Sequence, residues 1–268
     1  MASPEDLLKE GKIGECLGQL KEQIRNDPAN AKLRTFLFQV DCVIGDWKGA
    51  LKQLAVLKDM DPAAMPMVQT YQMAIQCEQV REEIFKGERA PLVMGEPPNW
   101  LATLMQSTSL TAQGHMEQAC DARDLAFEDA PMISGKVNDD TFEWMADGDQ
   151  RLGPALEAIV NGNYYWIPYD RIQSVTLEEP TDLRDFIWAP ANFKLANEGA
   201  AVGLVPVRYP GSAGNEDSKI QLSRMTVWED HGAEFYTGLG QKVLTTDQGE
   251  YSMLDIRSLK FDVEAEAE

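Results

Sequence analysis

The first half of the chain carries apolar side chains at helical spacing. One stripe consists of Leu33, Phe36, Leu37, Val40 and Ile44, which recur every three or four residues and therefore share one face of a helix. A second stripe follows the turn-forming pair Gly45-Asp46 and extends from Trp47 to Leu57. Together, the two stripes predict a hairpin of two antiparallel helices over residues 33–57.

This hairpin belongs to a longer repeat. Pro28, Pro62, Pro97 and Pro131 follow one another at steps of 34, 35 and 34 residues, which is the period of tetratricopeptide repeats. Three of the repeats also share a glycine followed five positions later by a small residue, namely Gly11 with Cys16, Gly45 with Ala50, and Gly114 with Ala119. Glycine permits the turn between two helices, and the small residue permits their close approach. We predict a tetratricopeptide-like helical repeat domain over residues 1–133.

The third repeat departs from this pattern. Phe85 stands where the other repeats have a small residue, and the segment 86–98 is rich in glycine and proline, so we expect an irregular third repeat. Stacked helical hairpins bury a shared core and leave a concave surface that suits a partner helix or an extended peptide. The alternative is an array that only supports the second half of the chain.

Beyond residue 162 the pattern changes from helical spacing to alternation. Strands are predicted at 164–167, 172–178, 192–196, 201–207, 220–228, 241–245 and 251–261, and helices at 154–161 and 183–188. Residues 134–153 resemble a linker with one anchoring turn. The predicted fold class is therefore α+β, with a strand-rich, mostly antiparallel domain over 154–261 and a disordered acidic tail over 262–268.

Charge and composition narrow the function. The chain has 24 Lys and Arg against 44 Asp and Glu, a net charge of −20, which argues against nucleic acid and anionic membranes as partners. The N-terminus lacks the features of a secretory signal, and no run of about 18 apolar residues occurs, so we expect a cytoplasmic protein. The four cysteines are far apart and are expected to be reduced residues of the helical core.

The sequence offers little catalytic chemistry. His115 and His231 fall in separate halves and in predicted turns, which disfavours a shared metal site. Phosphate-binding, dinucleotide and nucleophile-elbow motifs do not occur. A cluster of Asp182, Arg184 and Asp185 is the remaining candidate for a hydrolase. We therefore expect a binding protein with no enzymatic activity, no metal and no cofactor.

Aromatic and arginine side chains concentrate in the second half. Such residues are common at binding hot spots, because they bury a large area and still form hydrogen bonds, but they are also common in cores and sheets. The candidate partner-binding residues are Tyr165, Trp166, Arg184, Trp188, Arg208, Tyr209 and Trp228.

Four strings in the second half are more specific. They are Asn161-Gly-Asn-Tyr-Tyr-Trp-Ile-Pro168, Pro180-Thr-Asp-Leu-Arg-Asp-Phe-Ile-Trp-Ala-Pro-Ala191, Gly203-Leu-Val-Pro-Val-Arg-Tyr-Pro-Gly-Ser212, and Leu239-Gly-Gln-Lys-Val-Leu with Gly249-Glu-Tyr-Ser-Met-Leu-Asp-Ile-Arg257. In this order they resemble the ImpE family, also called the TagJ or SciE family, over residues 1 to about 261.

The resemblance implies a virulence-associated accessory factor of the bacterial type VI secretion system. It implies binding to the N-terminal helix of the small contractile-sheath subunit, proximity to the AAA+ ATPase that recycles the sheath, and no catalytic activity. The alternative function is a structural adaptor that self-associates, for example as a homodimer, with its repeats packed inward on the C-terminal sheet.

Overall fold

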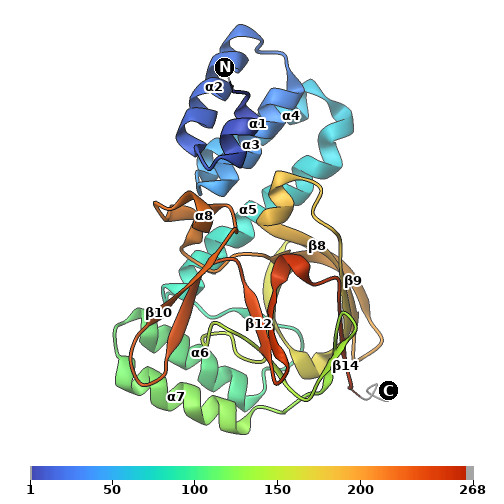
Figure 1. The fold of residues 1–268 in the computed structure, drawn as a ribbon. Helices are drawn as coiled ribbons and strands as arrows, with labels where there is room; N and C mark the ends of the chain where they lie inside the picture. The colour runs from blue at the N-terminus through green and yellow to red at the C-terminus, as the bar shows by residue number, and fades with distance from the viewer. Residues whose placement is uncertain (1, 264–268) are drawn as a thin grey trace.

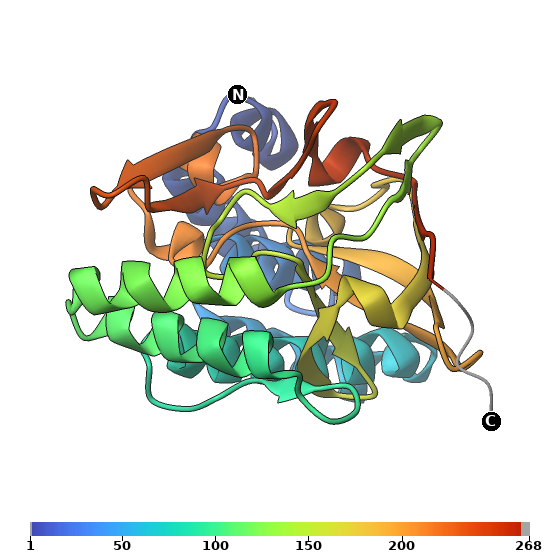
Figure 2. The ribbon, with the colours of Figure 1, turned by 90° about the horizontal axis from the view of Figure 1, so that it is seen from below.

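The structure is a computed structural model that describes residues 2–263 and arranges them in three layers (Figures 1 and 2). The first layer contains the helices α1 (Pro4–Lys9), α2 (Ile13–Asn26), α3 (Ala31–Val43), α4 (Trp47–Met60), α5 (Met65–Phe85), α6 (Asn99–Ala112) and α7 (Met116–Asp129). Helices α1 to α4 gather at one end, α6 and α7 lie at the opposite end, and α5 runs between them (Figure 1).

The turn glycines of the repeat act as predicted. Gly11, Gly45 and Gly114 follow α1, α3 and α6 in the left-handed region, with φ of +78°, +74° and +78°. The paired small residues Cys16, Ala50 and Ala119 are completely buried where the next helix packs back. Repeats one, two and four are therefore the helical hairpins α1–α2, α3–α4 and α6–α7.

The third repeat is irregular, as expected. Val80 occupies the position of the turn glycine, seventeen residues before Pro97. Helix α5, which is 21 residues long in total, continues through this position without a turn. The helix ends before Gly87, which has a φ of +73°. The chain then forms β1 (Leu92–Val93), which pairs in parallel with β6 (Asn163–Pro168). The third repeat thus contributes one long helix and an edge strand.

The second layer is a nine-stranded sheet with the order β1-β6-β5-β9-β8-β7-β14-β2-β3. Its remaining strands are β2 (Gly135–Val137), β3 (Asp140–Phe142), β5 (Ala155–Val160), β7 (Ile172–Leu177), β8 (Trp188–Leu195), β9 (Ala200–Pro206) and β14 (Ser258–Phe261). Apart from the β1–β6 pair, neighbouring strands within the described residues are antiparallel. The predicted α+β class with a mostly antiparallel sheet is confirmed.

The third layer is a three-stranded antiparallel sheet of β13 (Gly249–Ser252), β12 (Val243–Thr246) and β4 (Met145–Asp147). A separate hairpin consists of β10 (Thr226–Asp230) and β11 (Tyr236–Gly240). Between these layers lie two apolar cores. One core joins the helices to one face of the large sheet, and the other lies between the large sheet and the three-stranded sheet.

Strand β5 corrects the helix that we predicted over residues 154–161. Leu156, Ala158 and Val160 face the core between the two sheets, whereas Ala155 and Ile159 face the helices. Every residue of the strand is buried. A short apolar run that is covered on both faces cannot be distinguished from a buried helix by periodicity. The pair Asn161-Gly162, with φ of +50° and +74°, forms the two-residue turn into β6 and is a strong hairpin signal.

The expected linker over 134–153 also differs from the structure. This range contains β2, β3 and β4, and β2 pairs with β14 in the large sheet. The strands are only three residues long and are separated by polar turn residues, so they carry little periodic signal. These residues belong to the sheets.

Other predicted strands are confirmed or shortened. Residues 164–167 and 201–207 correspond to β6 and β9, and 172–178 to β7. The predicted helix 183–188 is a short 3-10 helix, η3 (Leu183–Phe186), after which β8 begins earlier than predicted. Three further predictions were partly wrong. The strand predicted at 241–245 is shifted to β12, and the one predicted at 220–228 is divided between α8 (Ser218–Gln221) and β10. The strand predicted at 251–261 is interrupted by the 3-10 helix η5 (Met253–Asp255).

The tail predicted over 262–268 lies mostly outside the described residues. Within residues 2–263, none of the helices combines the length and apolar character that a bilayer-spanning helix needs.

Candidate functional site

Side chains of the strand-rich half fill the face of the helices that meets the sheet. Trp188, the first residue of β8, is completely buried, with its ring 5.8 Å from that of Tyr71 and 6.2 Å from that of Trp47. Its indole Nε1 donates a hydrogen bond to Glu78 of α5 at 2.9 Å. This part of the helical surface is therefore covered by the protein's own strand-rich half.

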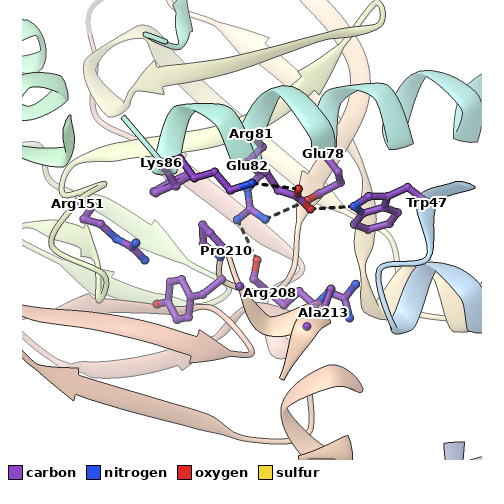
Figure 3. Close-up of a pocket in the computed structure, with 13 residues that line it drawn as sticks. Trp47, Glu78, Arg81, Glu82, Lys86, Arg151, Arg208, Pro210 and Ala213 are labelled. Carbon is purple, nitrogen blue, oxygen red and sulfur yellow. Dashed lines mark hydrogen bonds and ion pairs between the residues drawn. The ribbon is translucent and has the colours of Figure 1, made fainter. Parts of the chain in front are cut away.

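A buried ionic network lies at this junction, and Figure 3 shows Arg81 of this network with Glu78 and the backbone of Arg208. Arg81 of α5 forms a bidentate pair with Glu157 of β5, from Nε to Oε1 at 2.5 Å and from Nη2 to Oε2 at 3.0 Å. Arg81 also contacts Glu78 at 3.3 Å and donates to the carbonyl oxygen of Arg208 at 2.9 Å. Because both members of the bidentate pair are nearly inaccessible to water, the geometry of this pair fixes α5 on the sheet.

The network continues into the three-stranded sheet. Lys242 contacts Glu157 at 2.7 Å and also forms an ion pair with Asp147 of β4. Although burial by itself would raise the pKa of Glu157, the charges of Arg81 and Lys242 lower it to about 2. Burial raises the pKa of Asp147 to about 6, against the opposing effect of Lys242. Glu157 is therefore a permanent anion that joins all three layers.

Two arginines of the second half cap helices of the first. Arg208 donates to the carbonyl oxygens of Cys42 and Val43, both at 2.7 Å, at the end of α3. Arg224 donates to those of Leu8 and Lys9 at the end of α1, at 3.1 and 2.8 Å. A cation at a helix C-terminus satisfies free carbonyl groups and interacts favourably with the helix dipole.

A cavity of about 370 Å³ opens beside the network (Figure 3). Trp47, Phe85, Arg81, Arg151 and Tyr209 contribute to its lining. Both arginines already pair with carboxylates of the same chain, Arg81 with Glu157 and Arg151 with Asp149 at 2.5 Å. These charged groups are therefore engaged in ion pairs within the fold.

A second concavity is apolar and lies between the end of α7 and strand β4. This α7–β4 groove has a volume of about 410 Å³, and its larger lining side chains are Phe127, Met132, Ile133, Trp144, Met145 and Tyr169. Met132 is 74% exposed and Trp144 is 37% exposed, which is unusual for such large apolar groups. The groove therefore has the composition of a protein-binding site.

Acidic residues lie next to the groove in the sequence. Glu128 and Asp129 end α7, Glu143 precedes Trp144, and Asp247 follows β12; all four are exposed. The backbone N–H of Glu143 donates to Asp247 at 2.8 Å, and this hydrogen bond lowers the pKa of Asp247. Acidic side chains therefore flank groove residues along the chain.

The structure does not bring the predicted partner-binding residues together on one surface. Trp166, Trp188, Arg208 and Tyr209 lie in the interior, where the Trp166 indole donates to the Tyr164 hydroxyl at 2.7 Å.

The other three predicted residues are partly buried. Arg184 lies 4.7 Å from the ring centre of Tyr71, Trp228 packs 5.6 Å from Tyr209, and Tyr165 lies in β6 beside β1. Partner contact through this set stays a prediction, but the contacts that the structure gives these residues are internal.

The candidate hydrolase cluster has a structural role. Asp182 and Asp185 form a capping box at the start of η3, and Asp185 accepts hydrogen bonds from the N–H groups of Thr181 and Asp182, both at 2.9 Å. The two histidines stay apart: His115 precedes α7, and His231 bonds Thr237 in the β10–β11 hairpin at 2.8 Å. Residues 2–263 bring together no group of His, Cys, Asp and Glu suited to a metal ion.

Several residues of the buried network and of the groove escaped prediction from the sequence. Glu157 is a single acid in the apolar run 155–160, and Lys242 lies between polar and apolar residues next to β12. An acid inside a fully apolar run signals a buried pair, but the sequence does not reveal its partner. Met132 falls at the end of the predicted repeat domain and Trp144 in the predicted linker, and only the structure shows that they line one groove.

These features define a class of protein: a helical-repeat array joined to a strand-rich domain through a buried ionic network. The family model described as ImpE protein matches residues 139–260. The type VI secretion system accessory component TagJ of Pseudomonas aeruginosa is 45% identical over 258 residues, covering 96% of this chain and 90% of that protein. The chain therefore belongs to the ImpE family, and this TagJ is one of the relatives of the chain.

A solved structure supports the fold. An X-ray crystal structure of a protein from Vibrio parahaemolyticus is similar with a TM-score of 0.89 and 25% sequence identity. The similarity covers 97% of this chain and 98% of that chain. Both halves and their relative arrangement are therefore shared with a known structure.

Proposed function

We propose that this protein is a non-enzymatic accessory factor of a type VI secretion system that works in the cytoplasm. Its partner is the small contractile-sheath subunit, bound through the N-terminal helix of that subunit. Binding there assists assembly or disassembly of the sheath, close to the AAA+ ATPase that recycles sheath subunits. The 45% identity to the accessory component TagJ supports the secretion-system assignment.

The observation that carries the binding proposal is the α7–β4 groove. The helical face at the junction is filled by Trp188 and its neighbours, so a partner helix needs another apolar surface. The groove offers exposed Met132 and Trp144 above buried Met145, an arrangement that suits the apolar face of an amphipathic helix. Trp and Met side chains are enriched at the centres of such interfaces.

Charge supports a partner helix that has basic residues beside its apolar face. The chain carries a net charge of −20, and Glu128, Asp129, Glu143 and Asp247 lie near the groove. Opposite charge across an interface speeds association and suppresses wrong partners. We therefore expect faster binding at low ionic strength.

The test is titration of the full chain with a synthetic peptide of the sheath subunit's N-terminal helix, followed by calorimetry. Trp144→Ala and Met132→Ser should weaken binding at least about tenfold, a typical effect of losing an interface anchor. Val202→Ser is a matched control, because Val202 is 72% exposed and Met132 74%. Absence of binding by the wild type at tens of micromolar would refute sheath binding, and equal effects of all three substitutions would refute the groove.

A second candidate function is a self-associating structural adaptor. It is favoured by the inward packing of the repeats, since one core contains both Leu54 of α4 and Trp166 of β6. Light scattering over a range of concentrations separates the two proposals. A monomer at high concentration that still binds the peptide would reject the adaptor.

A further inference from the structure

A buried hydroxyl group among the groove residues lacks a hydrogen-bond partner. Tyr169 belongs to the short helix η2 (Tyr169–Arg171), is 2% exposed, and stacks on Phe261 with ring centres 4.9 Å apart. Within residues 2–263, the Tyr169 hydroxyl oxygen has no hydrogen-bond partner. Buried tyrosine hydroxyls normally find one, and leaving such a group unpaired costs about 1–3 kcal/mol.

The position of Tyr169 links this unpaired group to the groove. Tyr169 lines the α7–β4 groove together with Met145, Asp147 and Pro154. A ligand that filled the groove with hydrocarbon alone would leave the hydroxyl without a partner in the complex as well. The hydroxyl oxygen is itself buried, so a ligand must displace the side chains over it to place a hydrogen-bonding atom beside it. A ligand that does so removes this cost, so the hydroxyl favours one kind of occupant over another.

We infer that the α7–β4 groove selects a partner helix that carries one neutral hydrogen-bond acceptor among its apolar anchors, and that the Tyr169 hydroxyl donates to this acceptor. The inference rests on the proposed function, because it takes the sheath helix as the occupant. It makes Tyr169 a specificity-determining residue of the binding site.

The charge and protonation of the site define the chemistry of the acceptor. Burial raises the pKa of Tyr169, and the Asp147 carboxylate adds to this effect, so the hydroxyl keeps its proton and can donate. A carboxylate on the partner would be repelled by the acidic groups near the groove. Lysine and arginine lack acceptor atoms, so they cannot satisfy the O–H. The matching groups are the amide oxygen of Asn or Gln and the hydroxyl of Ser or Thr.

The experiment is a double-mutant cycle between the full chain and the sheath-helix peptide. Tyr169→Phe should leave the urea midpoint of unfolding unchanged or raise it, because it removes an unpaired polar group. The same substitution should weaken peptide binding about fivefold to tenfold, the effect of one lost hydrogen bond of about 1–1.4 kcal/mol. Replacing one polar peptide residue by an apolar isostere should weaken peptide binding to the wild type by the same factor. The same peptide change should cause no further loss of affinity for the Tyr169→Phe variant.

Tyr251→Phe is the matched control. The Tyr251 hydroxyl donates to Asp140 at 3.1 Å on the surface, away from the groove lining, so this substitution should leave peptide affinity unchanged. No binding by the wild type would refute the proposed function, and this inference with it. Wild-type binding that is equalled by Tyr169→Phe would overturn only the inference. Weaker binding without coupling to any peptide residue, or a lower urea midpoint for Tyr169→Phe, would also overturn it.

Discussion

Arg208 of the strand-rich half donates from Nη1 to the carbonyl oxygen of Val43, the last residue of α3, at 2.7 Å. The same Nη1 donates to the carbonyl oxygen of Gln221 at 2.6 Å, and Nη2 donates to that of Cys42 at 2.7 Å. One buried guanidinium thus connects the second repeat to helix α8. A cation in this position satisfies carbonyls that a helix end leaves free.

Loss of this guanidinium should destabilise the whole fold. Arg208→Met keeps much of the side-chain volume but leaves three carbonyl groups, two of them in buried contacts, without this donor, so the free energy of unfolding should fall by at least about 3 kcal/mol. Arg208→Lys should recover little, because an ammonium group lacks the planar fork that spans three acceptors. Urea unfolding measures both effects. Arg25→Met, at an exposed ion pair with Glu22, is the control and should change stability by less than about 0.5 kcal/mol.

The Arg81–Glu157 pair gives a second prediction. Glu157→Gln keeps the shape of the side chain but removes the charge that compensates buried Arg81 and Lys242, so we expect a loss of about 3–5 kcal/mol in unfolding free energy. Glu83→Gln is the matched control at the half-exposed pair with Arg89, where the loss should stay below about 1 kcal/mol. Similar losses of unfolding free energy for the two variants would show that burial does not increase the cost of breaking the ion pair.

Much of the helical half could be predicted from the sequence, because its signals are local. A glycine such as Gly45 and a small residue such as Ala50 act within a single hairpin, and the repeat period places both. The failures occurred where tertiary contacts determine the structure. The run that contains Glu157 is a strand that helices cover on one face and the three-stranded sheet covers on the other, so it lacks the alternation by which a strand is predicted.

The candidate site was less predictable for the same reason. Trp188 and Arg208 combine aromatic area or charge with hydrogen-bonding capacity, which is useful both in an interface and at an internal junction. Only the fold shows that they serve the junction. Met132 and Trp144 line the same groove, a proximity that no local pattern encodes.

Two glycines in the helical half should respond in opposite directions to alanine. Gly18 lies inside α2 and Gly114 follows α6 with a φ of +78°, and an added Cβ meets no atom within 4 Å at either position. Gly18→Ala should therefore stabilise the protein by about 0.5–1 kcal/mol through helix propensity. Gly114→Ala should destabilise it by about 1–2 kcal/mol, because an L-residue is strained in the left-handed region. Denaturant unfolding of both variants tests this, and a loss at Gly18 would contradict the helical assignment.

The last prediction concerns pH and Asp41, which is buried in the second repeat. Burial, together with the negative charge of Asp46, raises its pKa from 3.8 to about 7 against the opposing effect of Lys21. The folded protein therefore keeps this proton up to a higher pH than the unfolded chain does, so this residue's contribution to stability falls as pH rises from about 4 to about 7 and then levels off.

Asp41→Asn should remove this dependence. Above pH 7 the variant should be more stable than the wild type by on the order of 1–3 kcal/mol, after allowance for partial solvent screening. Near pH 4, where Asp41 is protonated in the folded protein, the two should be almost equal. Urea unfolding at pH 4.5, 6 and 8 measures the difference. A constant difference across this range would mean that Asp41 does not titrate there, and that its carboxylate is stabilised by the N-terminal end of α4.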